Sequence, residues 1–365
     1  MKFKLNKAEH LLSFALLNKI EKSKLSMREN KAASSSLIFH SIDGQLYIQS
    51  ENNLCCSKLL LQNVNVSEDG TFGLDISSFF NAINNFPTEE VQFIYNSEEN
   101  LLIFGNKKTR VSLATVPISN LQIDFAQNIE NLDITPDDFV QSIKMTSFSC
   151  APDFDEHPYT SILWFIEDGK INAQSSDKHR ISVFGNHYEL QHSYLISKVI
   201  SDIILFYIDK ISGLAFSLHN NKLYLSWNNG ELSCSLEKNT FEKIFTNFNQ
   251  FFQYVPFLSL EIKKDALIQS VKFVSNIANS HMINLTLDIN KLVVSATSNE
   301  KNAVVDTIEV ENYECLSVSY VSSHLVKVLE LLDSKNLKLN FLKHNDFILL
   351  MLETENFKHV LFPMD

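Results

Sequence analysis

The residues of this sequence that could do chemistry are a few histidines and acids that lie close together along the chain. Asp177 and His179 could form an acid–base pair, but neither a nucleophile nor an oxyanion-binding sequence accompanies them. The chain has only eight glycines, and they form neither of the phosphate-binding loops GxGxxG and GxxxxGK[ST]. From these residues alone, we interpret His179 and Arg180 as a structural pair.

Candidate metal ligands are equally few. His187 and His192 are five residues apart without a third ligand nearby, so we interpret them as a surface pair. The acidic loop 153–157 is interpreted as a solvated turn. The cysteines are odd in number and form no CxxC pair, which predicts reduced, mostly buried thiols. They are Cys55, Cys56, Cys150, Cys234 and Cys315. We therefore expect neither a metal site nor a cofactor.

Composition narrows the class of protein. The 365 residues are 45% hydrophobic and 20% charged, which is typical of a globular protein with two or three domains. The net charge is -12, whereas proteins that hold DNA by broad electrostatic attraction are normally basic. Any DNA contact must therefore depend on locally concentrated lysines or on geometry. No apolar run approaches the ~18 residues that span a bilayer, and no signal peptide begins the chain, so we expect a cytoplasmic protein.

One strand–turn–strand pattern occurs three times. It covers Leu37–Ser50, Leu163–Ser175 and Leu285–Ala296. The turns are evenly spaced, because Gly44 and Gly169 are 125 residues apart and Asn290 follows 121 residues later. Each copy is predicted to be a β-hairpin.

A second hairpin pattern has a matching period. It covers Val91–Phe104, Leu214–Leu225 and Leu337–Leu349. Its turns fall at Asn100, Asn221 and Asn345, which are 121 and 124 residues apart. Two unrelated features with one period indicate an internal repeat.

A helix is predicted before each hairpin. The expected helices cover about 6–23, 75–86, 135–149, 195–207, 263–279 and 322–333. In the fifth of these, Leu267, Val271 and Val274 form an apolar stripe. The sequence thus predicts an α+β fold of three repeated domains, at residues 1–127, 128–256 and 257–365, each with two helices and antiparallel sheets.

Four segments fit one known family. Ser175–Val183 resembles its T-D-G-H-R-L-A segment, Arg110–Pro117 its first-domain edge strand R-F-S-L-S-T-L-P, and His359–Asp365 its V-V-M-P-M-R-L ending. Ser298–Glu300, followed by a charged strand and Val318–Tyr320, is similar to its third domain. With the length and the three-domain layout, these segments make the whole chain resemble the bacterial DNA polymerase III beta subunit, the sliding clamp.

The resemblance implies the DNA clamp fold and a non-catalytic processivity factor without a cofactor. Two copies would form a head-to-tail homodimeric ring around duplex DNA, with helices lining the channel. The implied partners are the DNA polymerase III alpha subunit, the clamp loader and other proteins with a clamp-binding motif, and no membrane.

The resemblance also implies a peptide groove between the second and third domains, in which an apolar pocket takes the anchors of a partner. The matching residues are Tyr159, Ser176, Lys178, His179, Arg180, Ile181, Thr246, Gln250, Phe251, Val360, Leu361, Phe362, Pro363 and Met364. This chain has Lys178 where the family has glycine, and Phe251 and Phe362 replace smaller side chains. We expect the groove to keep its place but to prefer a different peptide.

Lysines on or beside the predicted helices are the expected source of a positive channel lining, and their contacts would go to phosphates without sequence readout. They are Lys24, Lys144, Lys198, Lys264, Lys272 and Lys327, and the resemblance adds His157. For ring closure it implies an edge strand with Val111 and Leu113 as apolar anchors and Ile277 as the opposite contact.

Two alternatives remain open. The altered groove also fits a specialised or phage-type clamp paralogue that serves a restricted partner set. The second alternative is a hydrolase that uses Asp177 and His179. This alternative predicts that His179→Ala abolishes turnover while peptide binding is retained.

Overall fold

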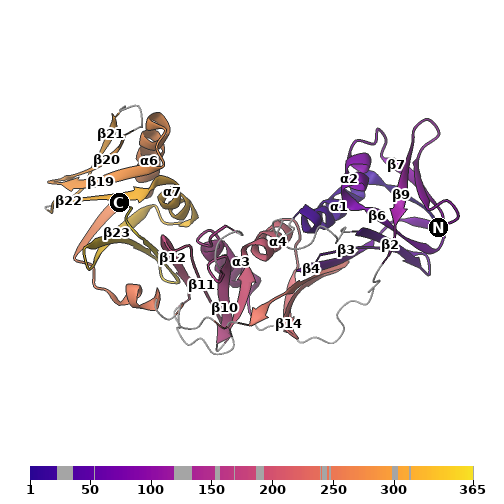
Figure 1. Ribbon diagram of the computed structural model, residues 1–365, viewed down its shortest axis with the longest axis horizontal. Helices are drawn as coiled ribbons and strands as arrows, with labels where there is room; N and C mark the ends of the chain where they lie inside the picture. The colour runs from indigo at the N-terminus through magenta and orange to yellow at the C-terminus, as the bar shows by residue number, and fades with distance from the viewer. Residues whose placement is uncertain are drawn as a thin grey trace. The chain divides into compact units, whose positions relative to one another are not determined.

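The computed structural model describes most of the 365 residues, and the chain divides into two compact units. Unit 1 comprises Met1–Pro136 and Val199–Glu237, and unit 2 comprises Asp137–Lys198 and Lys238–Asp365. The description omits residues 23–35, 53, 119–133, 153–156, 168, 186–192, 239, 241–244, 246–247, 298–302, 312–313 and 365. Figure 1 colours the chain by residue number.

Unit 1 is built on one twelve-stranded antiparallel sheet in the order β14–β15–β16–β4–β3–β2–β6–β9–β8–β7–β1–β5. Its strands are β1 (Lys2–Asn6), β2 (Ser36–Ile42), β3 (Gln45–Glu51), β4 (Cys55–Leu61), β5 (Asn65–Glu68), β6 (Gly70–Asp75), β7 (Glu90–Asn96), β8 (Leu101–Gly105), β9 (Arg110–Val116), β14 (Ala215–His219), β15 (Lys222–Trp227) and β16 (Gly230–Ser235). Its helices are α1 (Lys7–Lys22), α2 (Ile76–Asn84) and all but the first residue of α4 (Lys198–Ile208).

Phenylalanines dominate the core of unit 1, in a chain that has 28 of them. The ring of Phe79, on α2, meets that of Phe39, on β2, edge to face with centroids 5.3 Å apart. Phe3 stacks on Phe93 at 4.6 Å, on the neighbouring strands β1 and β7. Offset and edge-to-face pairs of this kind add to the energy of burial, so they fix α2 against its sheet.

Unit 2 contains a nine-stranded sheet in the order β17–β13–β10–β11–β12–β25–β24–β23–β18 and a four-stranded sheet in the order β21–β20–β19–β22 (Figure 1). The larger sheet contains β10 (Ser161–Glu167), β11 (Lys170–Ser176), β12 (Arg180–Phe184), β13 (Tyr194–Ser197), β17 (Glu237–Lys238), β18 (Leu258–Lys263), β23 (Asn336–His344), β24 (Phe347–Glu353) and β25 (Phe357–Leu361). The smaller sheet contains β19 (Met282–Asp288), β20 (Lys291–Thr297), β21 (Ala303–Glu309) and β22 (Leu316–Val321). The helices are α3 (Pro136–Ser147), α6 (Lys264–Ala278), α7 (Ser322–Leu331) and the 3-10 helix η1 (Gln250–Gln253).

The largest core of unit 2 lies under α6 and α7. The predicted stripe of α6 is buried there, since Leu267, Val271 and Val274 are fully enclosed. Asn279 ends the helix in the left-handed conformation that favours glycine or asparagine.

The predicted repeat is confirmed by the order of the elements. Each first hairpin follows a helix, as α1 precedes β2–β3, α3 precedes β10–β11 and α6 precedes β19–β20. Each second hairpin does the same, with α2 before β7–β8, α4 before β14–β15 and α7 before β23–β24. The turn residues Asn100, Asn221, Asn290 and Asn345 all have positive φ, which asparagine tolerates better than most residues.

Two strand pairs join segments that the sequence assigns to different domains. In unit 1, β4 pairs with β16, which links residues before and after the predicted boundary at 127. In unit 2, β12 pairs with β25 across the predicted boundary at 256. The compact units therefore do not coincide with the repeats, because each unit is held together by a continuous sheet.

One helix begins later than predicted. The expectation was a helix over 195–207, but Tyr194–Ser197 forms strand β13, which pairs with β10, and α4 starts at Lys198. Within the described ranges, no helix is long and apolar enough to cross a membrane.

Candidate functional site

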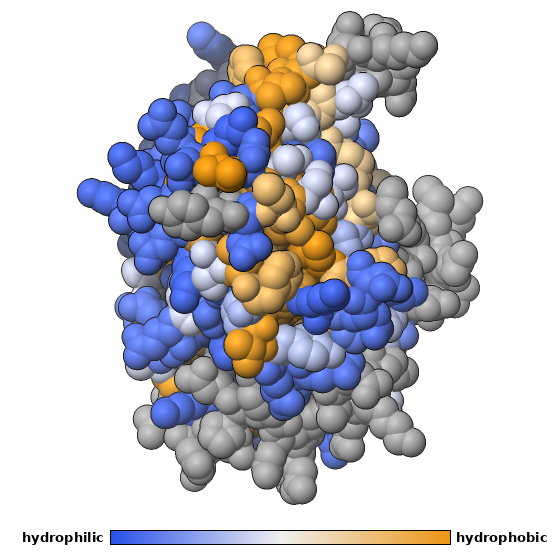
Figure 2. Space-filling view, turned by 90° about the vertical axis from the view of Figure 1, so that its left-hand side faces the viewer, coloured by the Kyte–Doolittle hydropathy of each residue, from blue (hydrophilic) through white to orange (hydrophobic). Residues whose placement is uncertain are grey.

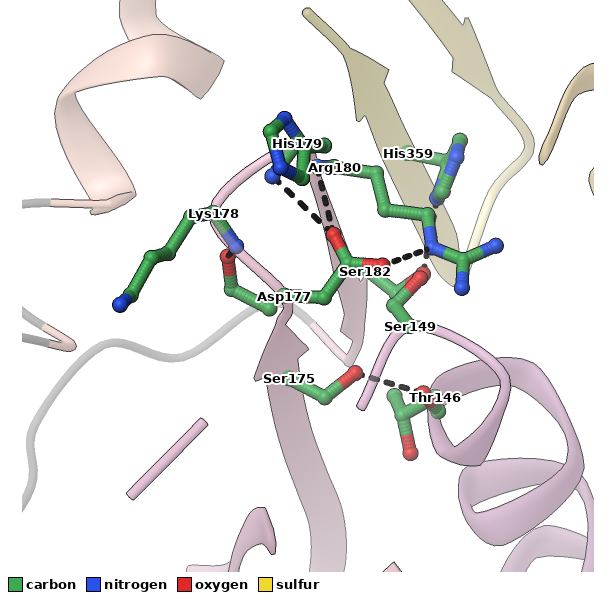
Figure 3. Close-up of polar contacts among 10 residues, drawn as sticks. Thr146, Ser149, Ser175, Asp177, Lys178, His179, Arg180, Ser182 and His359 are labelled. Atoms are coloured by element: carbon green, nitrogen blue, oxygen red, sulfur yellow. Dashed lines mark hydrogen bonds and ion pairs between the residues drawn. The ribbon is translucent and has the colours of Figure 1, made fainter. Parts of the chain in front are cut away.

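A tight turn between β11 and β12 places the polar residues of the predicted groove. The Asp177 carboxylate organises it: Oδ1 accepts hydrogen bonds from the backbone N–H groups of His179 and Arg180, at 3.0 and 3.1 Å. Oδ2 forms an ion pair with Arg180 Nε at 2.7 Å (Figure 3). The two side chains are largely buried, so this pair is stronger than a typical surface salt bridge.

Lys178 lies at the tip of this turn in an unusual conformation. Its φ is +75°, in the left-handed region that suits glycine, and its backbone N–H donates to Ser176 Oγ at 3.1 Å. The side chain extends away from Asp177 (Figure 3), and Nζ lies 4.8 Å from the centroid of the Tyr159 ring. The backbone of Lys178 therefore adopts a conformation typical of glycine, while its side chain places a cation above an aromatic ring.

The positive charge of Arg180 acts on neighbouring side chains. The Arg180 guanidinium lies 5.5 Å from the centroid of the Phe148 ring. Burial, followed by the positive charge of Arg180, lowers the pKa of His324, on α7, to about 4, while Asp177 opposes the shift. His324 is therefore neutral at physiological pH, and the charges of Asp177 and Arg180 cancel each other.

Apolar residues of the predicted groove form one cluster. Ile181 and Val360 are directly opposite each other in the β12–β25 ladder and are buried together with Phe251. Phe362 packs on this cluster, and its ring meets that of Phe251 edge to face at 5.1 Å. The two phenylalanines that distinguish this chain from the family pattern thus contact each other.

Two backbone hydrogen bonds hold the C-terminal residues in place. Phe362 N donates to the carbonyl oxygen of His179 at 3.0 Å, and Met364 N donates to that of Ser319 at 3.0 Å. Phe362, Pro363 and Met364 are half-buried, so they line the surface beside the turn.

Other predicted groove residues are placed differently. Leu361 points to the opposite face of its strand and is buried in the core under α6 and α7, because side chains alternate along a strand. Gln250 is exposed at the start of η1, and Ser176 is buried at the end of β11. Thr246 lies outside the described residues.

Sequence reasoning missed three aromatic residues of this site. Phe248 lies 6.2 Å from Tyr159 between ring centroids, and the Tyr254 hydroxyl is 2.8 Å from His344 Nδ1. His344 also meets the Phe251 ring at 5.1 Å. The aromatic run from Phe245 to Tyr254 was the available signal.

A buried polar chain lies beneath the turn. Ser149 Oγ is 2.7 Å from Ser182 Oγ, which is 2.8 Å from His359 Nδ1 (Figure 3). Burial, and then the positive charge of Arg180, hold the pKa of His359 well below its usual value. All three residues are enclosed, so this chain positions β12 and β25 and does not face a substrate.

The geometry does not favour the hydrolase alternative. The contacts of the Asp177 carboxylate are to the backbone of His179, the backbone of Arg180 and the Arg180 side chain, and none joins it to the His179 imidazole. A catalytic dyad would need the imidazole bond. Within the described ranges, no group of three or more His, Cys, Asp or Glu side chains could hold a metal ion.

The predicted DNA-binding residues lie mostly on helices. In unit 2, Lys272 of α6 forms an ion pair with Glu330 of α7 at 2.6 Å, and Lys327 is exposed on α7. Lys264 Nζ donates to the Leu332 carbonyl oxygen at 2.6 Å, so it also ties α6 to the end of α7.

The remaining members of that set are more scattered. Lys144 is half-buried in the last turn of α3, and Lys198 is half-buried at the start of α4. His157 is exposed at the start of the turn that carries Tyr159. Lys24 lies outside the described residues.

The predicted dimer contacts lie at incompletely paired strands and an apolar helix face. In β9, Val111 and Leu113 are half-buried, and only the last two residues of the strand pair with β6. In α6, Ile277 is 63% exposed and Phe273 52% exposed. Figure 2 shows a strip of hydrophobic side chains, flanked by hydrophilic ones, on the end of unit 2 that carries α6 and the four-stranded sheet.

No protein-family model and no curated protein matches this chain. Solved structures do match it. The DNA polymerase III subunit beta of Pseudomonas aeruginosa aligns with a TM-score of 0.81 at 14% identity, covering 100% of both chains. The beta subunit of Thermotoga maritima (TM-score 0.81, 15% identity) and the sliding clamp of Bacillus subtilis (0.81, 14%) each align over 100% of this chain and 99% of theirs.

The chain therefore has the DNA sliding-clamp fold, as its sequence predicts. The solved structures that share the fold over their full length include DNA polymerase III beta subunits from several bacteria.

Proposed function

We propose that this chain is a DNA sliding clamp, a non-catalytic processivity factor that encircles duplex DNA and tethers a polymerase. The observation that carries the proposal is the match of the entire chain to beta subunits at TM-scores near 0.8. On this proposal, the three repeats at 1–127, 128–256 and 257–365 are the three clamp domains.

The distribution of charge supports a role for the helices in holding DNA. The six described α-helices contain eight lysines and seven acidic residues, whereas the chain as a whole has a net charge of -12. The acidic excess is thus confined to strands and loops. A helix-lined channel would be far less repulsive to phosphates than the rest of the protein.

The strip of apolar surface on unit 2 supports a homodimer. Helix α6, which carries the exposed Ile277 and Phe273, packs against β21, which is an edge strand and has Val305 58% exposed. Exposed edges and apolar patches favour association, and β9 of a second copy offers Val111 and Leu113. Two such contacts, related by symmetry, close a head-to-tail ring.

The aromatic cluster around Phe251 and Phe362 supports partner binding. Apolar anchors in a pocket with a polar rim are typical of peptide recognition. The proposed partners are the DNA polymerase III alpha subunit, the clamp loader and other proteins with a clamp-binding motif, in the cytoplasm.

A topological experiment tests the proposal without a clamp loader. The protein is diluted until dimers dissociate, mixed with nicked circular plasmid, and concentrated so that rings close around the DNA. After a high-salt wash and gel filtration, we expect protein to co-elute with circular plasmid and to be released when one restriction cut linearises it. Electrostatic binding alone would be lost in salt on both forms.

The result that would overturn the proposal is equal retention on circular DNA and on DNA linearised before mixing. The control is Ile277→Asp, which should disrupt ring closure while leaving the helices intact. If this variant remained on circular DNA as well as the unaltered chain does, enclosure would not be the mode of binding.

A specialised clamp with a restricted partner set is the second candidate. Lys178 and the Phe251–Phe362 contact favour it, because both change the surface that would receive a partner peptide. A panel of clamp-binding peptides, titrated by fluorescence polarisation, separates the candidates. Binding of many peptides supports a general replicative clamp, and binding of one or two supports the specialised form.

A further inference from the structure

Two buried cysteines face each other where the twelve-stranded sheet passes from β4 to β16. Cys55 is the first residue of β4 and Cys234 is the last but one of β16, and the antiparallel ladder pairs them directly. They are 179 residues apart in the chain. Both belong to unit 1, and neither takes part in the surfaces described above.

The local hydrogen bonds show which kind of cross-strand pair they form. Ser235 N donates to the Leu54 carbonyl oxygen at 2.8 Å, so the bond joins the residues flanking the cysteine pair. Cys55 and Cys234 therefore occupy a non-hydrogen-bonded site, at which Cα atoms are about 4.5 Å apart. That spacing lies within the range of about 4.4 to 6.8 Å that a disulfide requires.

The side chains already point at each other. Cys55 Sγ and Cys234 Sγ are 3.2 Å apart, and the residues are 2% and 0% exposed. A disulfide bond measures about 2.05 Å, so the sulfurs need to approach by only about 1.2 Å, which small side-chain rotations supply. Cys56 is next in sequence but cannot substitute for Cys55, because adjacent residues of a strand point to opposite faces.

We propose that Cys55 and Cys234 are a disulfide-forming site that a two-electron oxidant of the peroxide class converts into a covalent link between β4 and β16. The inference is independent of the proposed clamp function, since it depends on the sheet of unit 1 alone.

The chemistry has two steps. When the strand end opens, the Cys55 thiol attacks hydrogen peroxide, so that an S–O bond forms, the O–O bond breaks and one water leaves. The Cys234 thiol then attacks the Cys55 sulfenic acid, so that the S–S bond forms, the S–O bond breaks and a second water leaves. Both thiols lose their protons, the two sulfurs give up two electrons in total, and one peroxide is reduced to two waters.

Because the two thiols are buried, this reaction requires the end of the β4–β16 strand pair to open. Burial raises the pKa of the Cys234 thiol well above its usual value, so the closed strand pair keeps that thiol protonated and unreactive. Cys55 is the first residue of β4. The side chain of Asn52 holds the start of the strand, because its Oδ1 accepts a hydrogen bond from Cys55 N at 2.8 Å. Oxidation should therefore report opening of this end of the ladder.

The test uses the full chain, exposed to hydrogen peroxide with and without urea below the unfolding range. Remaining thiols are blocked, and the intact mass and non-reduced peptides are measured. Compared with the fully reduced and blocked chain, we expect two blocking groups fewer and a further mass loss of about 2 Da, a cross-linked peptide pair that contains Cys55 and Cys234, and reversal by dithiothreitol. Because the link closes a very long loop, the melting temperature should rise by several degrees.

Three variants make the result specific. Cys55→Ser should abolish both the cross-link and the rise in melting temperature. Cys234→Ser should leave Cys55 as a sulfenic acid that a dimedone probe labels. Cys56→Ser is the matched control and should cross-link as the unaltered chain does.

The proposal is overturned if both thiols stay reduced in peroxide while urea measurably accelerates hydrogen exchange of the β4–β16 amides. It is also overturned if the bond maps to Cys56, Cys150 or Cys315. A cross-link that persists in Cys55→Ser would also overturn the proposal.

Discussion

The backbone N–H of Phe362 donates to the carbonyl oxygen of His179, and this bond joins the residue that follows β25 to the turn between β11 and β12. The turn and the C-terminal residues therefore form one surface, although 182 residues separate Phe362 from Arg180 in sequence. The Phe251 ring completes it by packing against Phe362.

This relationship predicts how a partner peptide responds to truncation. A fluorescent peptide of the Gln-Leu-x-Leu-Phe type should bind saturably to the full chain and at least about tenfold more weakly to a chain lacking residues 362–365, because an aromatic anchor is lost. Fluorescence polarisation measures both. Ile289→Ala, which removes an exposed side chain from the β19–β20 turn, is the control and should leave affinity unchanged. Equal binding to the full and truncated chains would contradict this site.

Lys178 predicts a stabilising substitution. Lys178→Gly should raise the free energy of unfolding by roughly 0.5 to 1 kcal/mol, because glycine adopts positive φ without the Cβ clash. Lys178→Ala is the matched control, since it removes the same charge but keeps the Cβ, and it should not stabilise. Urea unfolding followed by Trp164 fluorescence, in a Trp227→Phe background, measures unit 2. A loss of stability in Lys178→Gly would show that the side chain compensates for the strain.

Substitutions of Asp177 should lower the stability of unit 2 to different degrees. Asp177→Ala should lower the free energy of unfolding by about 2 to 3 kcal/mol, because two backbone donors and a largely buried guanidinium lose their acceptor. Asp177→Asn should cost less, since its amide oxygen can still accept from the His179 and Arg180 backbones. The same fluorescence measurement compares the two. Equal losses would mean that the ion pair with Arg180 contributes all of the stabilisation.

His359 predicts a loss of stability in acid. Its folded pKa lies well below the usual value, so below about pH 6.5 the unfolded chain binds a proton that the folded chain does not. This contribution should lower the free energy of unfolding by about 2 kcal/mol at pH 5 relative to pH 7. His359→Gln should make this dependence shallower and leave the share that comes from His324, whose pKa is also lowered, whereas His281→Gln, at an exposed position, should not change it. Urea unfolding at several pH values between 7 and 5 gives the slopes, and identical slopes would exclude His359 as the cause.

Ile277 predicts the oligomeric state. Ile277→Asp should convert a dimer into a monomer in light-scattering size-exclusion chromatography, because a charge would enter the apolar contact. Ile289→Asp is the control, since Ile289 is equally exposed (61%) but lies in the β19–β20 turn. A dimer that survives Ile277→Asp would place the contact elsewhere.

Local features were predictable from sequence because local physics determines them. The asparagines at 100, 221, 290 and 345 indicate turns through their tolerance of positive φ, and all four adopt it. The stripe on α6 follows from helical periodicity alone. The start of α4 was missed because a tertiary contact, the pairing of 194–197 with β10, overrides helix propensity there.

The candidate site was only partly predictable. The family resemblance located the turn at Asp177 and the C-terminal strand. Which side chains of that strand join the aromatic cluster depends on strand alternation, because Val360 faces the cluster and Leu361 faces the core under α6 and α7. His344 contributes from a distant hairpin, and no local pattern connects it to Phe251. Cys55 and Cys234 are likewise adjacent only through the register of β4 and β16.

The pairing of β4 with β16 and of β12 with β25 has a consequence for dissecting the molecule. Each junction between repeats is a backbone ladder, so cutting the chain at residue 127 or 256 would strip β4 or β12 of a neighbour and leave its N–H and C=O groups open along an edge. Open edges recruit other chains. A single repeat expressed alone should thus be prone to aggregate or swap strands with its copies, and the smallest well-behaved fragments should follow the two compact units, each formed from two separate stretches of sequence.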